Sequence, residues 1–340
     1  MRARDKAAQA RAKAERVALL SRKINELALQ IPGTRLEAQI QQLYYELERA
    51  GIDFKPGCYL ADEWGCPDSV PVIGIPFYLA DPQLSKLEGE LTGIEAEDER
   101  EVLMYLRHEA GHAFNYAYRL YALPEWQQTF GSFLRDYDDD YPAKPFSTRY
   151  VRNVPGWYSQ KHPDEDFAET FAVWLQPDSN WRERYADVPA LQKLLYVERL
   201  AREYGHKPPL VSVDALDSPV EQLSMTLGEW YATPPDRGDA ACKLPPLLDE
   251  DLHALFPAKE GLPAAKVLRA HRSQWIADLN RWTGLSRHLL EALFEQLLRR
   301  TEALGLKIGP DRISARLQDA AVFVTTLAMN YQYTGKFTAE

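Results

Sequence analysis

The chain contains 340 residues, of which 45% are hydrophobic and 26% are charged, a composition typical of a folded globular protein with one or two domains. Its 40 Lys and Arg residues are outnumbered by 50 Asp and Glu residues, and the net charge of −10 argues against a dedicated nucleic-acid binder. No stretch approaches the roughly 18 apolar residues of a membrane span, and the charged start of the chain lacks the apolar core of a secretory signal. We therefore expect a cytoplasmic enzyme or binding protein.

The first 30 residues form a basic, alanine-rich segment with eight Lys or Arg residues and three acidic residues. They contain no Gly or Pro, which favours a helix. A solvated helix that frays at its start is the simplest interpretation, and a basic arm for a membrane surface or an acidic partner is the alternative. We assign residues 1–33 to this N-terminal helical arm.

A helical pattern and two extended stretches follow over residues 34–80. Thr34 and Glu37 form a T-x-x-E capping box, and apolar residues at helical spacing continue from there to Gly51. Extended stretches are expected around residues 58–60 and 70–79. The second stretch is rich in β-branched and aromatic residues, but its prolines cannot donate hydrogen bonds to a ladder. An edge strand is therefore predicted near Val72–Leu79.

The rest of the chain is predominantly helical. The spacing of apolar residues predicts helices over residues 97–122, 163–175, 189–204 and 218–231. A Tyr- and Asp-rich loop region separates the first two of them. The Pro-, Gly- and Asp-rich stretch 233–247 is the predicted linker. Beyond it, helices are predicted near residues 248–256, 262–282, 286–304 and 311–330. We therefore predict an α+β domain over residues 34–232 and an all-α C-terminal domain over residues 248–340.

The most informative motif is His108-Glu109-Ala110-Gly111-His112, an H-E-x-x-H sequence within the long helical pattern. Residues four apart lie on one face of a helix, so both imidazoles can bind one zinc ion. Glu109 lies one step round the helix, where its carboxylate can accept a proton from a water at the metal. The alternative is a chance occurrence on a helix surface. The three cysteines show no C-x-x-C spacing and offer neither a disulfide framework nor a competing thiolate site.

A catalytic zinc site needs a third protein ligand, and the candidates lie in the predicted helix 163–175. Glu165 and Glu169 are four residues apart, so one can bind the metal while the other accepts a hydrogen bond from a ligand imidazole. Spacing alone does not choose between them. An ordinary acidic helix start, favoured by the helix dipole, is the alternative interpretation, and we prefer it for Asp164 and Asp166.

Three segments together resemble a bacterial family of zinc-binding metallopeptidases, which are zincins of the gluzincin type. The segments are Asp62-Glu-Trp through Ala80, Leu106-Arg-His-Glu-Ala-Gly-His112 and His162-Pro-Asp-Glu-Asp-Phe-Ala-Glu-Thr-Phe-Ala172. The Glu-x-Phe-Ala-Glu element within the last one is similar to that of anthrax lethal factor and the Mlc-titration-factor peptidases. The resemblance covers about residues 58–185 and implies that the first glutamate of the element, Glu165, is the third zinc ligand.

The resemblance also implies a functional tyrosine at Tyr158, seven residues before Glu165. A phenol there can donate a hydrogen bond to the oxyanion that forms when water attacks a carbonyl. His162 is the alternative donor, and we also expect it among the residues that surround the metal ligands. In a chain with 18 tyrosines, packing is the other interpretation of Tyr158. Glu165 lies in the first turn after Pro163, and Glu169 lies one turn deeper, where it is better placed to bond a ligand imidazole.

These predictions converge on a zincin-like α+β core in which two helices hold one zinc ion per chain. The expected function is hydrolysis of peptide bonds with Glu109 as general base and with the peptide or protein substrate paired along Val72–Leu79. The C-terminal helices either cover the cleft or bind a partner protein. Two alternatives stay open, namely hydrolysis of a non-peptide amide or ester, and a zinc-bound interaction module without catalysis. An intact Glu109 disfavours the module, because a scaffold needs no general base.

Overall fold

The computed structural model describes residues 11, 13–92, 96–138, 141, 143–213, 216–232, 244 and 248–337. The chain forms two compact units. The first contains Met1–Phe133 and Phe167–Asp236, and the second contains Leu134–Asp166 and Arg237–Glu340. The loop region 134–166, which the sequence placed within the domain 34–232, is grouped here with the C-terminal helices. Residues 1–10 of the arm and all of the linker 233–247 except Leu244 lie outside the described residues.

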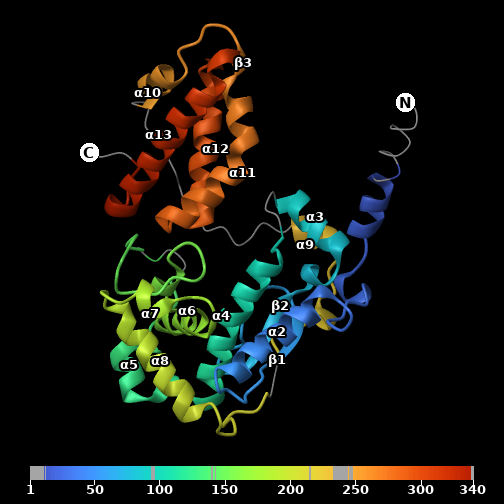
Figure 1. Cartoon of the computed structure of the whole chain (residues 1–340). Helices are drawn as coiled ribbons and strands as arrows, with labels where there is room; N and C mark the ends of the chain where they lie inside the picture. The colour runs from blue at the N-terminus through green and yellow to red at the C-terminus, as the bar shows by residue number, and fades with distance from the viewer. Residues whose placement is uncertain are drawn as a thin grey trace. The chain divides into compact units, whose positions relative to one another are not determined.

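Helices dominate the first unit, which also holds a small parallel sheet, so the chain has the predicted mixture of helix and strand (Figure 1). Its helices are α2 (Arg35–Arg49), α3 (Pro82–Thr92), α4 (Glu99–Tyr118), α5 (Pro124–Phe130), α6 (Pro163–Leu175), α7 (Trp181–Arg184), α8 (Ala190–Tyr204) and α9 (Leu227–Ala232). The first turn of α6 precedes the boundary between the units at residue 167. In the described part of the chain, no helix combines the length and the apolar composition that a membrane crossing requires.

Side-chain caps mark the starts of α4 and α9. Asp98 and Glu101 form a reciprocal capping box at the start of α4. The helix predicted over residues 218–231 begins later than expected, because Thr226 and Glu229 supply its cap. Glu229 accepts a hydrogen bond from the Thr226 N–H at 2.8 Å, and the Thr226 hydroxyl accepts one from the Glu229 N–H at 3.1 Å. The helical part of this segment is therefore α9, preceded by a short 3-10 turn.

The sheet of the first unit consists of β1 (Gly57–Ala61) and β2 (Val72–Pro76), which pair in parallel from Gly57↔Val72 to Ala61↔Pro76. All five residues of β2 are buried. The strand ends at Pro76, and a 3-10 turn over Phe77–Ala80 follows it. The sheet packs against α4, which carries the H-E-x-x-H motif.

β2 is an edge strand of this two-stranded sheet, as predicted near Val72–Leu79, but Gly65 pairs with Gly74 on its outer side. Gly74 donates a backbone hydrogen bond to the Gly65 carbonyl at 2.7 Å and accepts one from the Gly65 N–H at 3.3 Å. A Cβ atom added at Gly74 would lie 3.2 Å from that carbonyl oxygen and 3.0 Å from the Ala61 Cβ. The missing side chain of Gly74 thus lets the segment around Gly65 cover β2 on the side away from β1.

The second unit contains three long helices that lie side by side, α11 (Ala264–Thr283), α12 (Arg287–Ala303) and α13 (Ile313–Thr334), together with α10 (Leu248–Leu255) (Figure 1). A two-residue antiparallel ladder of β3 (Leu262–Pro263) and β4 (Lys307–Ile308) accompanies them, so the C-terminal part is not purely helical. The loop region 134–166 joins this unit by contacts between distant residues. The indole N–H of Trp157, for example, donates to the Trp282 carbonyl at 3.2 Å.

A buried ion pair joins α2 to α4. The Arg107 guanidinium donates two hydrogen bonds to the Glu46 carboxylate, at 2.7 and 2.8 Å, and the two side chains are only 11% and 1% exposed. Removing one partner of a buried pair leaves the other charge desolvated without compensation. Since Arg107 directly precedes His108, the pair also fixes α4 next to the motif.

We expect Glu46→Gln to destabilise the first unit by about 3–5 kcal/mol, because Arg107 stays buried without its carboxylate. The control is Glu90→Gln, which removes an exposed ion pair with Arg16 and is expected to cost less than about 1 kcal/mol. Urea unfolding of the two variants and the wild type measures the difference. Equal effects of the two substitutions would show that the buried pair stabilises the protein no more than a surface pair does.

Candidate metal centre

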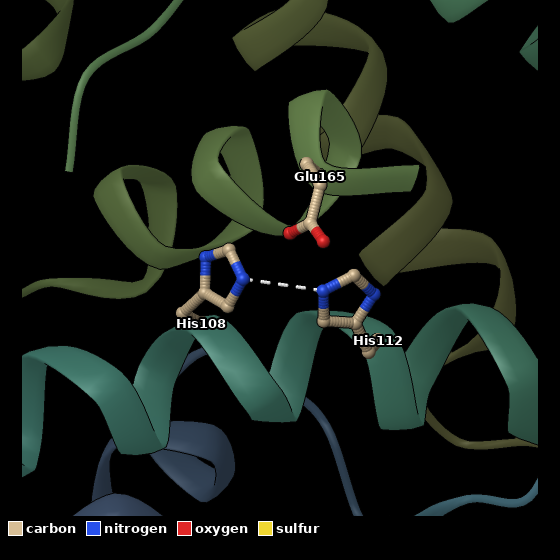
Figure 2. Close-up of side chains that lie close together, drawn as sticks. All are labelled: His108, His112 and Glu165. Carbon is tan, nitrogen blue, oxygen red and sulfur yellow. Dashed lines mark hydrogen bonds between the residues drawn. The ribbon is translucent and has the colours of Figure 1, made fainter. Parts of the chain in front are cut away.

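Helix α4 places the two histidines of the motif on one buried face. His108 is 2% exposed and His112 is 6% exposed. Their Nε2 atoms lie 3.2 Å apart, as the dashed line in Figure 2 marks. A tetrahedral zinc ion with bonds of about 2.0–2.1 Å separates two ligand nitrogens by ~3.3 Å. The imidazoles therefore already have the separation that a shared metal ion requires.

Helix α6 supplies the third group. The Glu165 carboxylate and the two imidazoles each offer one ligand atom, and these three atoms all lie within 4.8 Å of one another. Figure 2 shows the carboxylate pointing from α6 toward the two rings on α4. Glu165 is 5% exposed, so it is as buried as the histidines. The structure thus brings together the three residues that were predicted to bind the metal.

Glu169 holds the ring of His108 from the other side. Its Oε1 lies 2.9 Å from the Nδ1 of His108, and the glutamate side chain is fully buried. A carboxylate can only accept at this position, so Nδ1 carries the proton and Nε2 presents its lone pair toward His112. This is the contact that the sequence led us to expect for the second glutamate of the pair, one turn after Glu165.

A close approach of the two helices at Gly111 makes this arrangement possible. A Cβ atom added at Gly111 would lie 2.8 Å from the Ala168 Cα and 3.1 Å from the Ala168 carbonyl oxygen. No side chain fits there, so the backbones of α4 and α6 touch between the two histidines of α4 and the two glutamates of α6. Because α6 is one continuous helix, this contact also positions Glu165 in its first turn.

His162 caps the start of α6. Its Nδ1 accepts a hydrogen bond from the Asp164 N–H at 3.1 Å, and its Nε2 lies 2.7 Å from the Arg135 carbonyl oxygen, to which it donates. The ring is also stacked on Tyr137, with centroids 4.0 Å apart. Burial lowers the pKa of His162, in keeping with the neutral ring that these two hydrogen bonds require. Both ring nitrogens of His162 therefore bond backbone groups, and its role around the ligands or as an oxyanion donor stays a prediction.

Two aspartates flank Glu165 in an unexpected environment. Asp164 and Asp166 lie in the first turn of α6, as expected for an acidic helix start, but their exposures are only 0% and 1%. With Glu165 and Glu169, the first two turns of α6 hold four buried carboxylates. Burying carboxylates is costly unless cations or hydrogen-bond donors compensate them, and a bound cation is one such group.

The two predicted catalytic residues have different surroundings. Glu109 is 5% exposed, next to His108 on α4, and its backbone carbonyl accepts a hydrogen bond from the Cys66 thiol with a distance of 3.3 Å. Tyr158 lies half-buried in a 3-10 turn, with the Lys161 ammonium 5.4 Å from the centre of its ring. The contact with Lys161 gives no direct support for an oxyanion donor, so the role of Tyr158 stays a prediction.

Sequence reasoning missed the residues that hold the site in place. Gly111 and Ala168 were assigned no role, although both lie inside the motifs and their small size was the available signal. Cys66 was considered only for disulfides and zinc. Its contact with Glu109 joins residues 43 positions apart, and no local pattern indicates such a contact.

Comparisons with known proteins give no further assignment. No family model matches the chain, and neither a curated protein nor a solved structure does so. The chemistry therefore has to be argued from the donor set itself. Two imidazole nitrogens and one carboxylate oxygen form a common protein ligand set of catalytic zinc sites, in which the remaining position is open to water or substrate.

We expect Gly111→Ala to cost about 1–3 kcal/mol of stability and to lower the zinc affinity, because the added methyl group forces α4 and α6 apart. The control is Gly57→Ala, whose Cβ would make an ordinary contact of 3.6 Å with Val72. Thermal unfolding and a chelator competition measure the two effects. An unchanged zinc affinity in Gly111→Ala would show that the helix separation does not determine the ligand spacing.

Glu165→Ala is expected to remove most of the zinc at neutral pH, since it deletes the carboxylate that faces both imidazoles. Glu169→Ala keeps all three ligand groups and is expected to weaken zinc binding by roughly 10–100-fold through loss of the hydrogen bond to His108. Elemental analysis gives the stoichiometry, expected at one zinc per chain, and chelator competition gives the affinities. The reverse order of effects would exchange the roles of the two glutamates.

Proposed function

We propose that the protein is a zinc-dependent peptidase whose active site is the group formed by His108, His112 and Glu165. The observation that carries this proposal is the buried ligand set with Glu109 directly beside it on α4. A mixed set of nitrogen and oxygen donors at this spacing suits zinc. When bound, the ion would supply Lewis acidity, which polarises a carbonyl and makes water more acidic. The short motifs shared with zinc metallopeptidases support the same class of reaction.

Glu109 acts in this proposal as the general base. Its carboxylate takes a proton as water attacks the substrate carbonyl, holds this proton, and delivers it to the leaving amine. The residue is almost completely buried and belongs to the same helix as both histidines, so its distance from them is fixed by the helix. A zinc-bound scaffold without catalysis would need no general base beside its ligands.

Three further residues support catalysis in this proposal, two by positioning the metal ligands and one by contacting the oxyanion. Glu169 fixes the ring orientation and the protonation of His108, which leaves Nε2 available as a ligand. His162 secures the helix turn that contains Glu165. Tyr158 is the proposed donor to the oxyanion. We do not extend the proposal to substrate pairing along Val72–Leu79, because β2 is buried and its centre is bonded to Gly65.

We expect Glu109→Gln to keep the fold and the zinc content but to lose turnover by roughly 10²–10⁴-fold, because the amide cannot accept the proton. The control is Glu99→Gln, an exposed glutamate in the first turn of the same helix. Digestion of a proteome-derived peptide pool by zinc-loaded protein, read by mass spectrometry, measures turnover.

Full activity of zinc-loaded Glu109→Gln would contradict the proposed role of the glutamate. Zinc-loaded wild-type protein that hydrolyses small amides or esters but no peptide would support the non-peptide alternative. Zinc binding without hydrolysis of any of these substrates would favour the interaction module.

A further inference from the structure

The first unit contains a cavity of about 230 Å³ outside the metal-ligand group. It lies beside the end of β1, between the segment 62–67 and the turn around Asp217. Pockets for whole small-molecule ligands are typically about 300–1,000 Å³, so this one is suited to a single side chain of a larger ligand. A pocket of this size is the kind of feature by which an enzyme selects one residue of a peptide.

The wall of this cavity is fixed to the helix that carries the general base. The Cys66 thiol donates to the Glu109 carbonyl at 3.3 Å. Trp64 stacks on Tyr105, one turn before Glu109, with ring centroids 5.5 Å apart and planes at 19°. The indole N–H of Trp64 also donates to the Glu97 carboxylate at 3.1 Å. Two residues of the cavity wall, Trp64 and Cys66, therefore contact α4, and Cys66 does so at the backbone of the residue proposed to perform the proton transfer.

The lining of the cavity is acidic. Three carboxylates line it, those of Asp62, Glu63 and Asp217, and no lining residue in the described part of the chain is Lys, Arg or His. The Tyr59 hydroxyl, which accepts from the Asp217 N–H at 3.2 Å, holds the turn against β1. Trp64 adds an aromatic side chain. Carboxylates together with an aromatic ring recognise cations, through charge-assisted hydrogen bonds and cation–π contact.

We infer that this cavity binds the side chain of a Lys or Arg residue of the peptide substrate, close to the bond that is cleaved. The inference rests on the proposed peptidase function and adds the substrate class to it. The lining comes from three separate chain segments, within residues 59–67, at residue 74 and at residues 217–218. A free amino terminus is the other cation that a peptide offers, and peptides with an acetylated amino terminus distinguish it from a side chain.

The test uses full-length, zinc-loaded protein and a set of matched peptides that vary at one position among Arg, Lys, Gln and Glu, each with a free or an acetylated amino terminus. We expect Arg and Lys peptides to be cleaved with a kcat/KM at least roughly tenfold above that of the Gln peptide, the value of one charge-assisted hydrogen bond. Asp62→Asn should lower kcat/KM for the Arg and Lys peptides more than for the Gln peptide. Asp217→Asn serves as a second variant, and Glu48→Gln, on the exposed surface of α2, is the control.

A binding measurement separates this inference from the proposed function. Fluorescence anisotropy with Glu109→Gln reports the affinity for the same peptides without turnover. Cleavage without preference for Arg or Lys, or with a preference that Asp62→Asn and Asp217→Asn do not change, would overturn the inference and leave the peptidase intact. Loss of binding on acetylation would also overturn it, in favour of the amino terminus. Binding of Arg and Lys peptides that depends on Asp62, without any cleavage, would support the pocket and refute the peptidase.

Discussion

The close packing of α4 on α6 at Gly111 and Ala168 is the constraint on which the candidate site depends. The two backbones approach so closely that a Cβ at Gly111 would lie 2.8 Å from the Ala168 Cα. On either side of this contact, α4 presents a histidine and α6 presents a glutamate. The spacing of four residues recurs in both helices, so one point of contact brings His108 to Glu169 and both histidines to Glu165. The ligand geometry is thus a property of helix packing.

The same packing places acidic groups where water is largely excluded. Asp164, Glu165 and Asp166 occupy the first turn of α6, where unpaired backbone N–H groups and the helix dipole favour negative charge. Their burial still has a cost, since each carboxylate loses hydration. A helix start is therefore the least unfavourable place for such a cluster, and a cation bound beside it would offset part of the remaining cost. His162 adds to this arrangement by accepting a hydrogen bond from the Asp164 N–H, so that the turn is held whether or not an ion is present.

The parts of the structure that follow local rules were predictable from the sequence. α4 and α6 appear where the spacing of apolar residues indicated, and the spacing of histidines and glutamates indicated the composition of the ligand group. Contacts between distant residues were not predictable. The pairing of Gly65 with Gly74, which covers β2, depends on two glycines whose meeting no short pattern indicates. The grouping of residues 134–166 with the C-terminal helices likewise depends on contacts such as that of Trp157 with Trp282, which are 125 positions apart.

Three consecutive residues, Trp64, Gly65 and Cys66, connect the sheet, the cavity and the proposed general base, Glu109. Gly65 bonds Gly74 of β2, Cys66 bonds the carbonyl of Glu109, and Trp64 stacks on the same helix one turn earlier. All three also line the acidic cavity. A shift of the cavity wall would therefore strain both the sheet and α4. The proposed peptidase would need to hold a substrate bond within a fraction of an ångström of the reacting groups, and the proposed pocket, attached to the helix of Glu109, would transmit substrate position to the site.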